Sequence, residues 1–375
     1  MPSKLIYLVT EDWYFWSHRL PMARAAREAG FDVAVATRVT AHGERIAAEG
    51  FRVHPLSWRR RSHGPLEALA AIAEIVRLYR REKPDIVHHV ALKPAVLGGI
   101  AARIAGVGAV VCALTGLGFA FTDPGPRAAV ARTAITAVLR WLNRRPGSVV
   151  LLQNEDDLAR LLACGAARPE RTAVIRGSGI DIARYLPRPE PPGPFTVAFV
   201  GRMIGIKGVR TLIAAHGLLR AQGRPVRLVL AGAPDAENPG SLGEAELQAL
   251  GREPGIEWRG HVADIRSVWA DAHVAVQPSL GGEGLPKSLL EAAACGRPVI
   301  ASDVPGCREI AIPGVTGLRV PPGDADALAE AIASLADDAA ARARYGAAAR
   351  RLAEESFAAD RIGRDTVDLY RRLLG

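Results

Sequence analysis

The chain has 375 residues, of which 49% are hydrophobic and 23% charged, and its formal net charge is +9. A single hydrophobic core stops growing at about 250–300 residues. Because this chain is longer, we expect two domains. The first residues lack a basic region followed by an apolar run, and no stretch of about eighteen apolar residues is free of charge, so we expect neither a signal peptide nor a transmembrane helix. The cysteines have no metal-ligand or redox spacing, which indicates reduced core thiols of a cytosolic protein. They are Cys112, Cys164, Cys295 and Cys307.

The net positive charge comes entirely from the first half of the chain. Residues 1–190 contain 27 Lys and Arg against 17 Asp and Glu, a balance of +10, and the rest contains 21 against 22, a balance of −1. The excess is concentrated at 59–61, 77–83 and 140–145, with Tyr and Trp interleaved. Such a basic face suits an anionic membrane surface or a nucleic acid. Because no nucleic-acid-binding motif accompanies it, we expect a membrane surface; solvated helix ends are the alternative.

Strands and helices alternate through the first half of the chain, which predicts a parallel sheet covered by helices on both faces. The predicted strands are 5–10, 31–36, 52–54, 85–90, 107–114, 148–152 and 172–175, and the main predicted helices are 20–29, 66–81, 95–105, 127–142 and 155–164. Residues 186–194 then contain five prolines in nine residues, which indicates a stiff linker. The sequence therefore predicts domains at 1–188 and 195–355.

A second alternation begins after the proline-rich segment. Its predicted strands are 195–200, 226–231, 256–259, 274–277 and 299–301, with a helix at 209–219 and a largely helical end from 324. The fold class predicted from both halves is α/β, with two doubly wound, Rossmann-like domains.

A glycine loop at residues 201–208 follows the first strand of the second half and opens a helix. A strand, a glycine loop and a helix start together form a phosphate cradle, to which Arg202 and Lys207 add positive charge. A purely structural turn is the alternative.

A second glycine-rich loop, at residues 281–296, turns into a short helix. Glu283, Lys287 and Glu291 recur at four-residue spacing, so they can share one helical face. Eight helical residues span roughly 12 Å, too far for two carboxylates to share a proton but suited to the two ends of an elongated ligand such as a sugar nucleotide. A surface loop that caps a core helix is the alternative.

These two loops resemble motifs of the retaining glycosyltransferases of family 4, whose GT-B fold has two Rossmann-like domains and a cleft between them. Residues 281–296 resemble the E-x7-E element, residues 201–208 the G-R-x(n)-K-G element, and residues 259–264 the G-x-V loop beside the nucleobase. In this family the last helix packs back on the first domain, which we expect of residues 356–375. The resemblance implies donor binding by Gly201, Arg202, Lys207, Val262, Glu283, Gly284, Leu285, Pro286 and Glu291, and catalytic roles for Glu283, Arg202, Lys207 and His18.

The first half resembles the family less closely. The loop at 7–21 lacks a Gly-Gly pair, but an exposed acidic and aromatic loop followed by Ser17-His18-Arg19 is similar to members that extend lipid-linked glycans in bacterial surface polysaccharide synthesis, as is the segment 115–119. Residues 85–94 resemble the D-x-x-H-x-H element, with Val90 where the second histidine is expected. The remaining candidates in this half are His88, His89, Lys93, Ser178 and Asp181.

The resemblance implies transfer of a sugar from a nucleoside diphosphate donor, a UDP-sugar, to a hydroxyl of a glycan acceptor linked to undecaprenyl diphosphate. It also implies retained anomeric configuration, no metal cofactor, and a peripheral place at the cytoplasmic face of the cell membrane. Two alternatives stay open: a UDP-sugar 2-epimerase of the same fold, and a non-catalytic nucleotide-binding protein at the membrane.

Overall fold

The computed structural model describes residues 2–60, 64–118, 121 and 125–375, and in it the chain forms two compact units. The first unit ends at Gly179 and is completed by Ala359–Gly375, and the second is Ile180–Ala358. The chain therefore changes unit twice. Among the described residues, none of the helices is both long enough and apolar enough to cross a bilayer.

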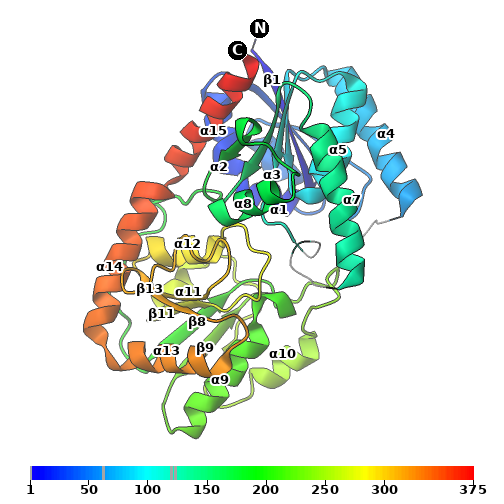
Figure 1. The fold of residues 1–375 in the computed structure, drawn as a ribbon. Helices are drawn as coiled ribbons and strands as arrows, with labels where there is room; N and C mark the ends of the chain where they lie inside the picture. The colour runs from blue at the N-terminus through cyan, green and yellow to red at the C-terminus, as the bar shows by residue number, and fades with distance from the viewer. Residues whose placement is uncertain (1, 61–63, 119–120, 122–124) are drawn as a thin grey trace. The chain divides into compact units, whose positions relative to one another are not determined.

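The first unit is built on a seven-stranded parallel sheet with the order β3-β2-β1-β4-β5-β6-β7 (Figure 1). Buried apolar runs such as Val33–Ala36 form its inner strands, as expected where both faces of a parallel sheet are covered. The strands are β1 (Lys4–Glu11), β2 (Asp32–Arg38), β3 (Arg52–Pro55), β4 (Ile86–Val90), β5 (Ala109–Ala113), β6 (Ser148–Leu152) and β7 (Thr172–Val174).

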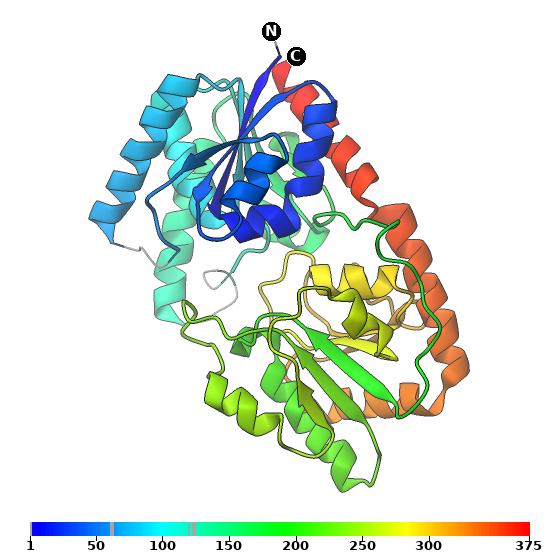
Figure 2. The same ribbon diagram turned by 180° about the vertical axis from the view of Figure 1, so that it is seen from behind.

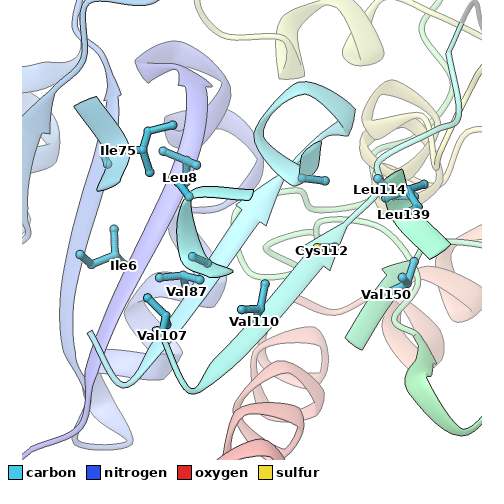
Figure 3. Packing of buried hydrophobic residues seen from close by; sticks show 14 of the residues in the cluster. Ile6, Leu8, Ile75, Val87, Val107, Val110, Cys112, Leu114, Leu139 and Val150 are labelled. Atoms are coloured by element: carbon cyan, nitrogen blue, oxygen red, sulfur yellow. The ribbon is translucent and has the colours of Figure 1, made fainter. Parts of the chain in front are cut away.

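Helices cover both faces of this sheet, and each face has its own core. Side chains of β1 alternate between them: Ile6 and Leu8 pack with one cluster, and Leu5 and Tyr7 with the other. Figure 3 shows the first cluster, in which Ile6, Leu8 and Val87 lie together. The helices are α1 (Asp12–His18), α2 (Leu20–Glu28), α3 (Gly43–Ala48), α4 (Pro65–Glu82), α5 (Leu92–Ala105), α7 (Pro126–Leu142), α8 (Glu155–Ala163) and α15 (Ala359–Leu374).

The last helix, α15, is part of the first unit. It packs against α2, and its end lies beside the start of β1 in both views (Figures 1 and 2). The fully buried Tyr370 hydroxyl lies 2.7 Å from the Tyr7 hydroxyl and 2.6 Å from His88 Nδ1. These hydrogen bonds join the end of the chain to two central strands of the sheet.

The second unit has a six-stranded parallel sheet with the order β10-β9-β8-β11-β12-β13, and two core clusters line its faces. The structure thus confirms the predicted pair of Rossmann-like parallel-sheet folds. The strands are β8 (Thr196–Val200), β9 (Arg227–Ala231), β10 (Ile256–Trp258), β11 (Val274–Gln277), β12 (Val299–Ser302) and β13 (Gly317–Val320). The helices are α9 (Val209–Ala221), α10 (Glu244–Leu250), α11 (Arg266–Ala270), α12 (Lys287–Ala294), α13 (Ala325–Asp337) and α14 (Ala339–Ser356), and two 3-10 turns in the chain are η1 (Pro169–Arg171) and η2 (Gly205–Lys207).

The proline-rich segment is held within the second unit. Arg297, which is almost fully buried, donates to Trp269 O at 2.8 Å and to Pro189 O at 2.9 Å. Arg342 forms an ion pair with Glu190 at 2.7 Å. The sequence predicts the boundary at residues 188–195, whereas the contacts divide the chain at Gly179.

One local prediction was wrong. The acidic and aromatic segment at 12–18 is a helix, α1, and not an exposed loop. Asp12 is fully buried, and its carboxylate is satisfied there by hydrogen bonds from the amides of Thr40 and His42, both at 2.7 Å. The chain turns at residues 314–316 and enters the edge strand β13 at Gly317, where a Cβ would lie 1.7 Å from Val299 O.

Candidate functional site

The two glycine loops of the second unit lie against each other. The loop after β8 ends at Gly208, which caps α9 with φ +73°, and a Cβ at this position would lie 1.8 Å from Pro278 O. Leu280, in the loop after β11, donates its amide to Ile206 O at 2.8 Å. A glycine is therefore required where the two loops touch. Because both loops follow the carboxyl ends of neighbouring strands, they lie at the edge where open parallel sheets bind ligands.

The contact of the two loops brings Lys207 and Glu283 together. Lys207 Nζ donates to both carboxylate oxygens of Glu283, at 2.7 and 2.9 Å. Only 19% of the Lys207 side chain and 11% of the Glu283 side chain are exposed, so this ion pair is largely removed from water. A partly desolvated charge pair is a place where an incoming anion can exchange partners with the carboxylate.

A chain of hydrogen bonds fixes Glu283 from behind. Ser279 Oγ donates to Glu283 Oε1 at 2.6 Å, and Gln277 Nε2 donates to Ser279 Oγ at 2.7 Å. Ser288 Oγ, on α12, donates to Gln277 Oε1 at 3.0 Å. The sequence places Gln277 at the end of a predicted strand and Ser288 in the segment 281–296, and it gives neither Ser279 nor Ser288 a role. These three side chains hold the carboxylate in place.

Glu291 lies inside α12 and is almost fully buried. Tyr185 donates its hydroxyl to Glu291 Oε1 at 3.1 Å, and Lys287 Nζ lies 3.7 Å from the same oxygen. Burial raises the pKa of the Glu291 carboxyl above its ordinary 4.5, while the Lys287 charge and the Tyr185 hydroxyl oppose that rise. Tyr185 was not predicted, because it stands 106 positions from its partner and outside any motif.

The two glutamates do not share a helical face, which corrects the sequence interpretation. The helix α12 begins only at Lys287, with Pro286 as its N-cap, so Glu283 belongs to the preceding loop. Gly284, Leu285 and Pro286 are buried where the loop turns into the helix. The backbone there is tightly enclosed, since a Cβ on Gly306 would lie 1.7 Å from Gly284 O.

Arg202 stands apart from the Lys207–Glu283 pair. It follows Gly201 directly after β8, is 44% exposed, and donates to Asp235 Oδ2 at 2.5 Å. The sequence did not indicate Asp235 as its partner. Val262 is half-buried against the hydrophobic cluster that also contains Leu285. The two predicted cations are thus each paired with a carboxylate.

The predicted histidines lie in the first unit. His18, at the end of α1, has Nδ1 2.6 Å from Ser17 Oγ, and its ring stacks on Tyr14 with centroids 4.3 Å apart. His88 and His89 are fully buried within β4. Burial holds the pKa of His88 well below its ordinary value and lowers the pKa of His89 to about 3. Both are neutral core residues, so neither is a ligand-facing group.

The other candidates of the first half are structural or exposed. Lys93 Nζ donates to Arg59 O at 2.5 Å, and Ser178 is buried. Asp181, which belongs to the second unit, is exposed and accepts from the amides of Ala183 and Arg184. Phe119 of the 115–119 segment and Arg61 of the first basic cluster lie outside the described residues. Within the described ranges, no group of three or more His, Cys, Asp or Glu side chains could hold a metal ion.

Both units match glycosyltransferase family models. Residues 4–144 match the model described as glycosyl transferase 4-like, and residues 194–338 match the model described as glycosyl transferases group 1. The chain is therefore related to glycosyltransferases through both of its units.

Two curated relatives and one solved structure define this relationship further. The capsular polysaccharide biosynthesis glycosyltransferase CapM of Staphylococcus aureus is 31% identical over 180 residues, 48% of this chain, and the chain spans about half the length of that relative, 47%. The N,N'-diacetylbacillosaminyl-diphospho-undecaprenol alpha-1,3-N-acetylgalactosaminyltransferase of Campylobacter jejuni is 24% identical over 371 residues, 95% of each chain. Anabaena HepE, solved with UDP and glucose, has a TM-score of 0.78 at 21% identity and covers 98% of this chain and 99% of its own. The fold is accordingly GT-B.

Proposed function

We propose that the protein is a glycosyltransferase that moves a sugar from a nucleoside diphosphate donor to a hydroxyl group of a glycan acceptor. The observation that carries the proposal is the arrangement in the second unit: a phosphate-type glycine loop with Lys207 at its end, touching a loop and helix start that carry Glu283 and Glu291. The donor we propose is a UDP-sugar, because HepE was solved with UDP and glucose on the same fold.

Lys207 and Arg202 would neutralise the diphosphate that leaves with the bond to the sugar. Each is paired with a carboxylate, Asp235 or Glu283, which a phosphate oxygen of the donor would replace. Preorganised charges of this kind stabilise a leaving group as its negative charge develops. Since side-chain cations supply this charge, we propose that transfer needs no metal ion.

The two carboxylates would hold the two ends of the donor. Glu291, buried beside Tyr185, would accept hydrogen bonds from the ribose hydroxyls, and Glu283 would accept from hydroxyls of the sugar once Lys207 turns to the diphosphate. We propose that the acceptor attacks the face from which the diphosphate leaves and that a phosphate oxygen takes its proton, which retains the anomeric configuration. Gly201, Val262 and the buried Gly284–Pro286 turn would line the donor.

For the acceptor we propose a glycan linked to undecaprenyl diphosphate, held at the cytoplasmic face of the cell membrane. The Campylobacter jejuni relative carries diphospho-undecaprenol in its name and aligns along 95% of this chain. The +10 balance of residues 1–190 fits an anionic lipid surface.

The decisive experiment incubates the protein with single nucleotide sugars and bacterial lipid extract and identifies the product by mass. If the protein transfers sugar, a lipid-linked product heavier by one sugar should appear, and only with a matching donor. Donor incubated without acceptor tests the alternative of a 2-epimerase, since only an epimerase changes the sugar. If calorimetry detects no binding of UDP or any other nucleoside diphosphate, the donor site is wrong. Nucleotide binding without turnover of any donor would favour the non-catalytic alternative.

A further inference from the structure

Arg19 of the first unit is a buried cation with no counter-charge among the residues that the structure describes. It stands between α1 and α2, and only 2% of it is exposed. Among the described residues, the one hydrogen bond of its side chain runs from Nη1 to the thioether of Met22 at 3.3 Å. Across the described ranges, no carboxylate, carbonyl or hydroxyl accepts a hydrogen bond from its guanidinium, and Nε is buried without a partner. An arginine stays charged in proteins, and an unpaired buried charge costs several kcal/mol.

The groups around Arg19 do not neutralise it. Its positive charge acts on the buried Tyr7 and Tyr370 hydroxyls, where it opposes the burial that raises their pKa, and it adds to the lowered pKa of His88. All three groups are therefore neutral at pH 7. By contrast Arg24, on the next helix, is exposed and forms a bidentate pair with Glu49. The neighbouring arginine therefore has a carboxylate partner, whereas Arg19 has none among the described residues.

A pocket opens beside Arg19. The pocket and the open space at its mouth together have a volume of about 230 Å³. The enclosed part is no larger than a water molecule. Thr115, Gln153 and Gly177 line it with Arg19, and each follows the carboxyl end of a strand: β5, β6 and β7. Ligands of open parallel sheets bind at this edge.

We propose that Arg19 binds an anionic oxygen, from a phosphate or a carboxylate, of the acceptor substrate. The enclosed space is about the size of one water molecule and so admits a single anionic oxygen, and the rest of the molecule lies at the mouth of the pocket. Guanidinium groups bind both kinds of anion through paired N–H donors. The anion site follows from the first unit alone; its assignment to the acceptor rests on the proposed glycosyltransferase function.

The test measures anion binding with the donor site disabled. Calorimetry and thermal unfolding are carried out with inorganic phosphate and with acetate, at constant ionic strength set with sodium chloride, on Lys207→Ala, on Arg19→Met/Lys207→Ala and on Arg24→Met/Lys207→Ala. We expect Lys207→Ala and the Arg24 control to bind at least one of the anions, and the Arg19 variant to bind it on the order of tenfold more weakly or not at all. Phosphate binding alone points to a phosphorylated acceptor, and acetate binding alone to an acidic sugar.

Two further measurements are the unfolding temperature of Arg19→Met and the binding of UDP to the wild type. Without added anion, Arg19→Met should unfold at the same temperature as the wild type or higher, because it removes an unpaired charge and keeps an apolar chain of similar length. A lower unfolding temperature together with unchanged anion affinity would overturn the proposed site and leave Arg19 as a structural residue. Binding of UDP to the wild type is measured separately, so failure of the donor site is distinguished from failure of the anion site. If Arg19→Met does not fold, Arg19→Lys, which keeps the charge, serves in its place, with weaker phosphate binding expected because the fork of donors is lost.

Discussion

At the scale of single residues, the ion pair of Lys207 and Glu283 is the feature most directly tied to the proposed chemistry. The Glu283 carboxylate is paired with the same lysine that we propose binds the donor diphosphate. Binding would therefore exchange one anion for another. This makes the two residues unequal: loss of the lysine removes a phosphate contact, whereas neutralising the glutamate releases the lysine.

We therefore predict opposite effects on free UDP. Lys207→Ala should weaken UDP binding by about 1.5–3 kcal/mol, the value of a charge-assisted hydrogen bond. Glu283→Gln should leave the affinity for UDP unchanged or raise it, and should lower the rate of sugar transfer. Calorimetry gives the affinities, with Arg224→Ala as control, since Arg224 pairs with Asp337 away from the loops. Equal loss of UDP affinity in both variants would contradict the assignment of Glu283 to the sugar.

Glu291 leads to a prediction about pH. Its pKa is raised in the folded protein, so the stability it contributes is fully present below the unfolded value near 4.5 and is lost as the pH rises through the folded pKa. Glu291→Gln does not titrate, so its stability relative to the wild type should increase with pH above about 4.5. Urea unfolding across pH 4.5–8 measures this difference. The variant should also bind UDP more weakly, since the proposed ribose contact is altered. A stability difference that is constant with pH would contradict the buried carboxylate.

At the scale of elements, the turn from η2 into α9 depends on one glycine. Gly208 has φ +73°, and a Cβ would lie 1.8 Å from Pro278 O, whereas Gly217 is exposed within α9 and a Cβ there would meet nothing within 4 Å. We predict that Gly208→Ala lowers the free energy of unfolding by at least about 2 kcal/mol, since the backbone strain alone costs 1–2 kcal/mol. Gly217→Ala should raise it by about 0.5–1 kcal/mol. Urea unfolding of both variants is the measurement, and destabilisation by Gly217→Ala would show that the contrast does not come from backbone conformation.

The elements were also the level at which the sequence was most informative. The alternation of apolar strands and amphipathic helices predicted most strands of both sheets, because buried parallel strands are continuous apolar runs. The loops carrying Lys207 and Glu283 were found because glycines and charges cluster there within a few positions. Tyr185, Asp235 and the role of Ser279 were missed, since their partners are brought to them only by the fold. The helix α1 was missed because its aromatic residues lack a helical period and its buried Asp12 is satisfied by amides of a distant loop.

At the scale of the whole molecule, the division of charge gives a prediction about membranes. Each basic residue near an anionic bilayer contributes about 1 kcal/mol, and the attraction is screened over roughly 8–10 Å, so binding should fall steeply with salt. We expect the protein to co-sediment with vesicles containing anionic lipid at low salt and to remain in solution with neutral vesicles. Changing Arg59, Arg60 and Arg61 together to Ser should weaken the binding.

The matched control changes the same number of charges in the second unit. Arg220, Arg252 and Arg344 are exposed there, and their joint change to Ser should leave vesicle binding unaltered. Binding that ignores lipid charge and salt would refute the electrostatic account. Binding that survives the change at Arg59–Arg61 would move the contact to residues 140–145, although Arg140 already donates to the carbonyls of Cys164 and Gly165.

The buried hydroxyl of Tyr370 has a consequence for the order in which the molecule can be completed during synthesis. The ribosome makes β1 and β4 early, but the partner of Tyr7 and His88 arrives 282 residues after His88. All of Ile180–Ala358 is translated in between. The second unit therefore has its whole sequence while the first still lacks α15, and Tyr7 and His88 lack a hydrogen-bond partner there. The first unit therefore gains α15 only after all of the second unit has been translated.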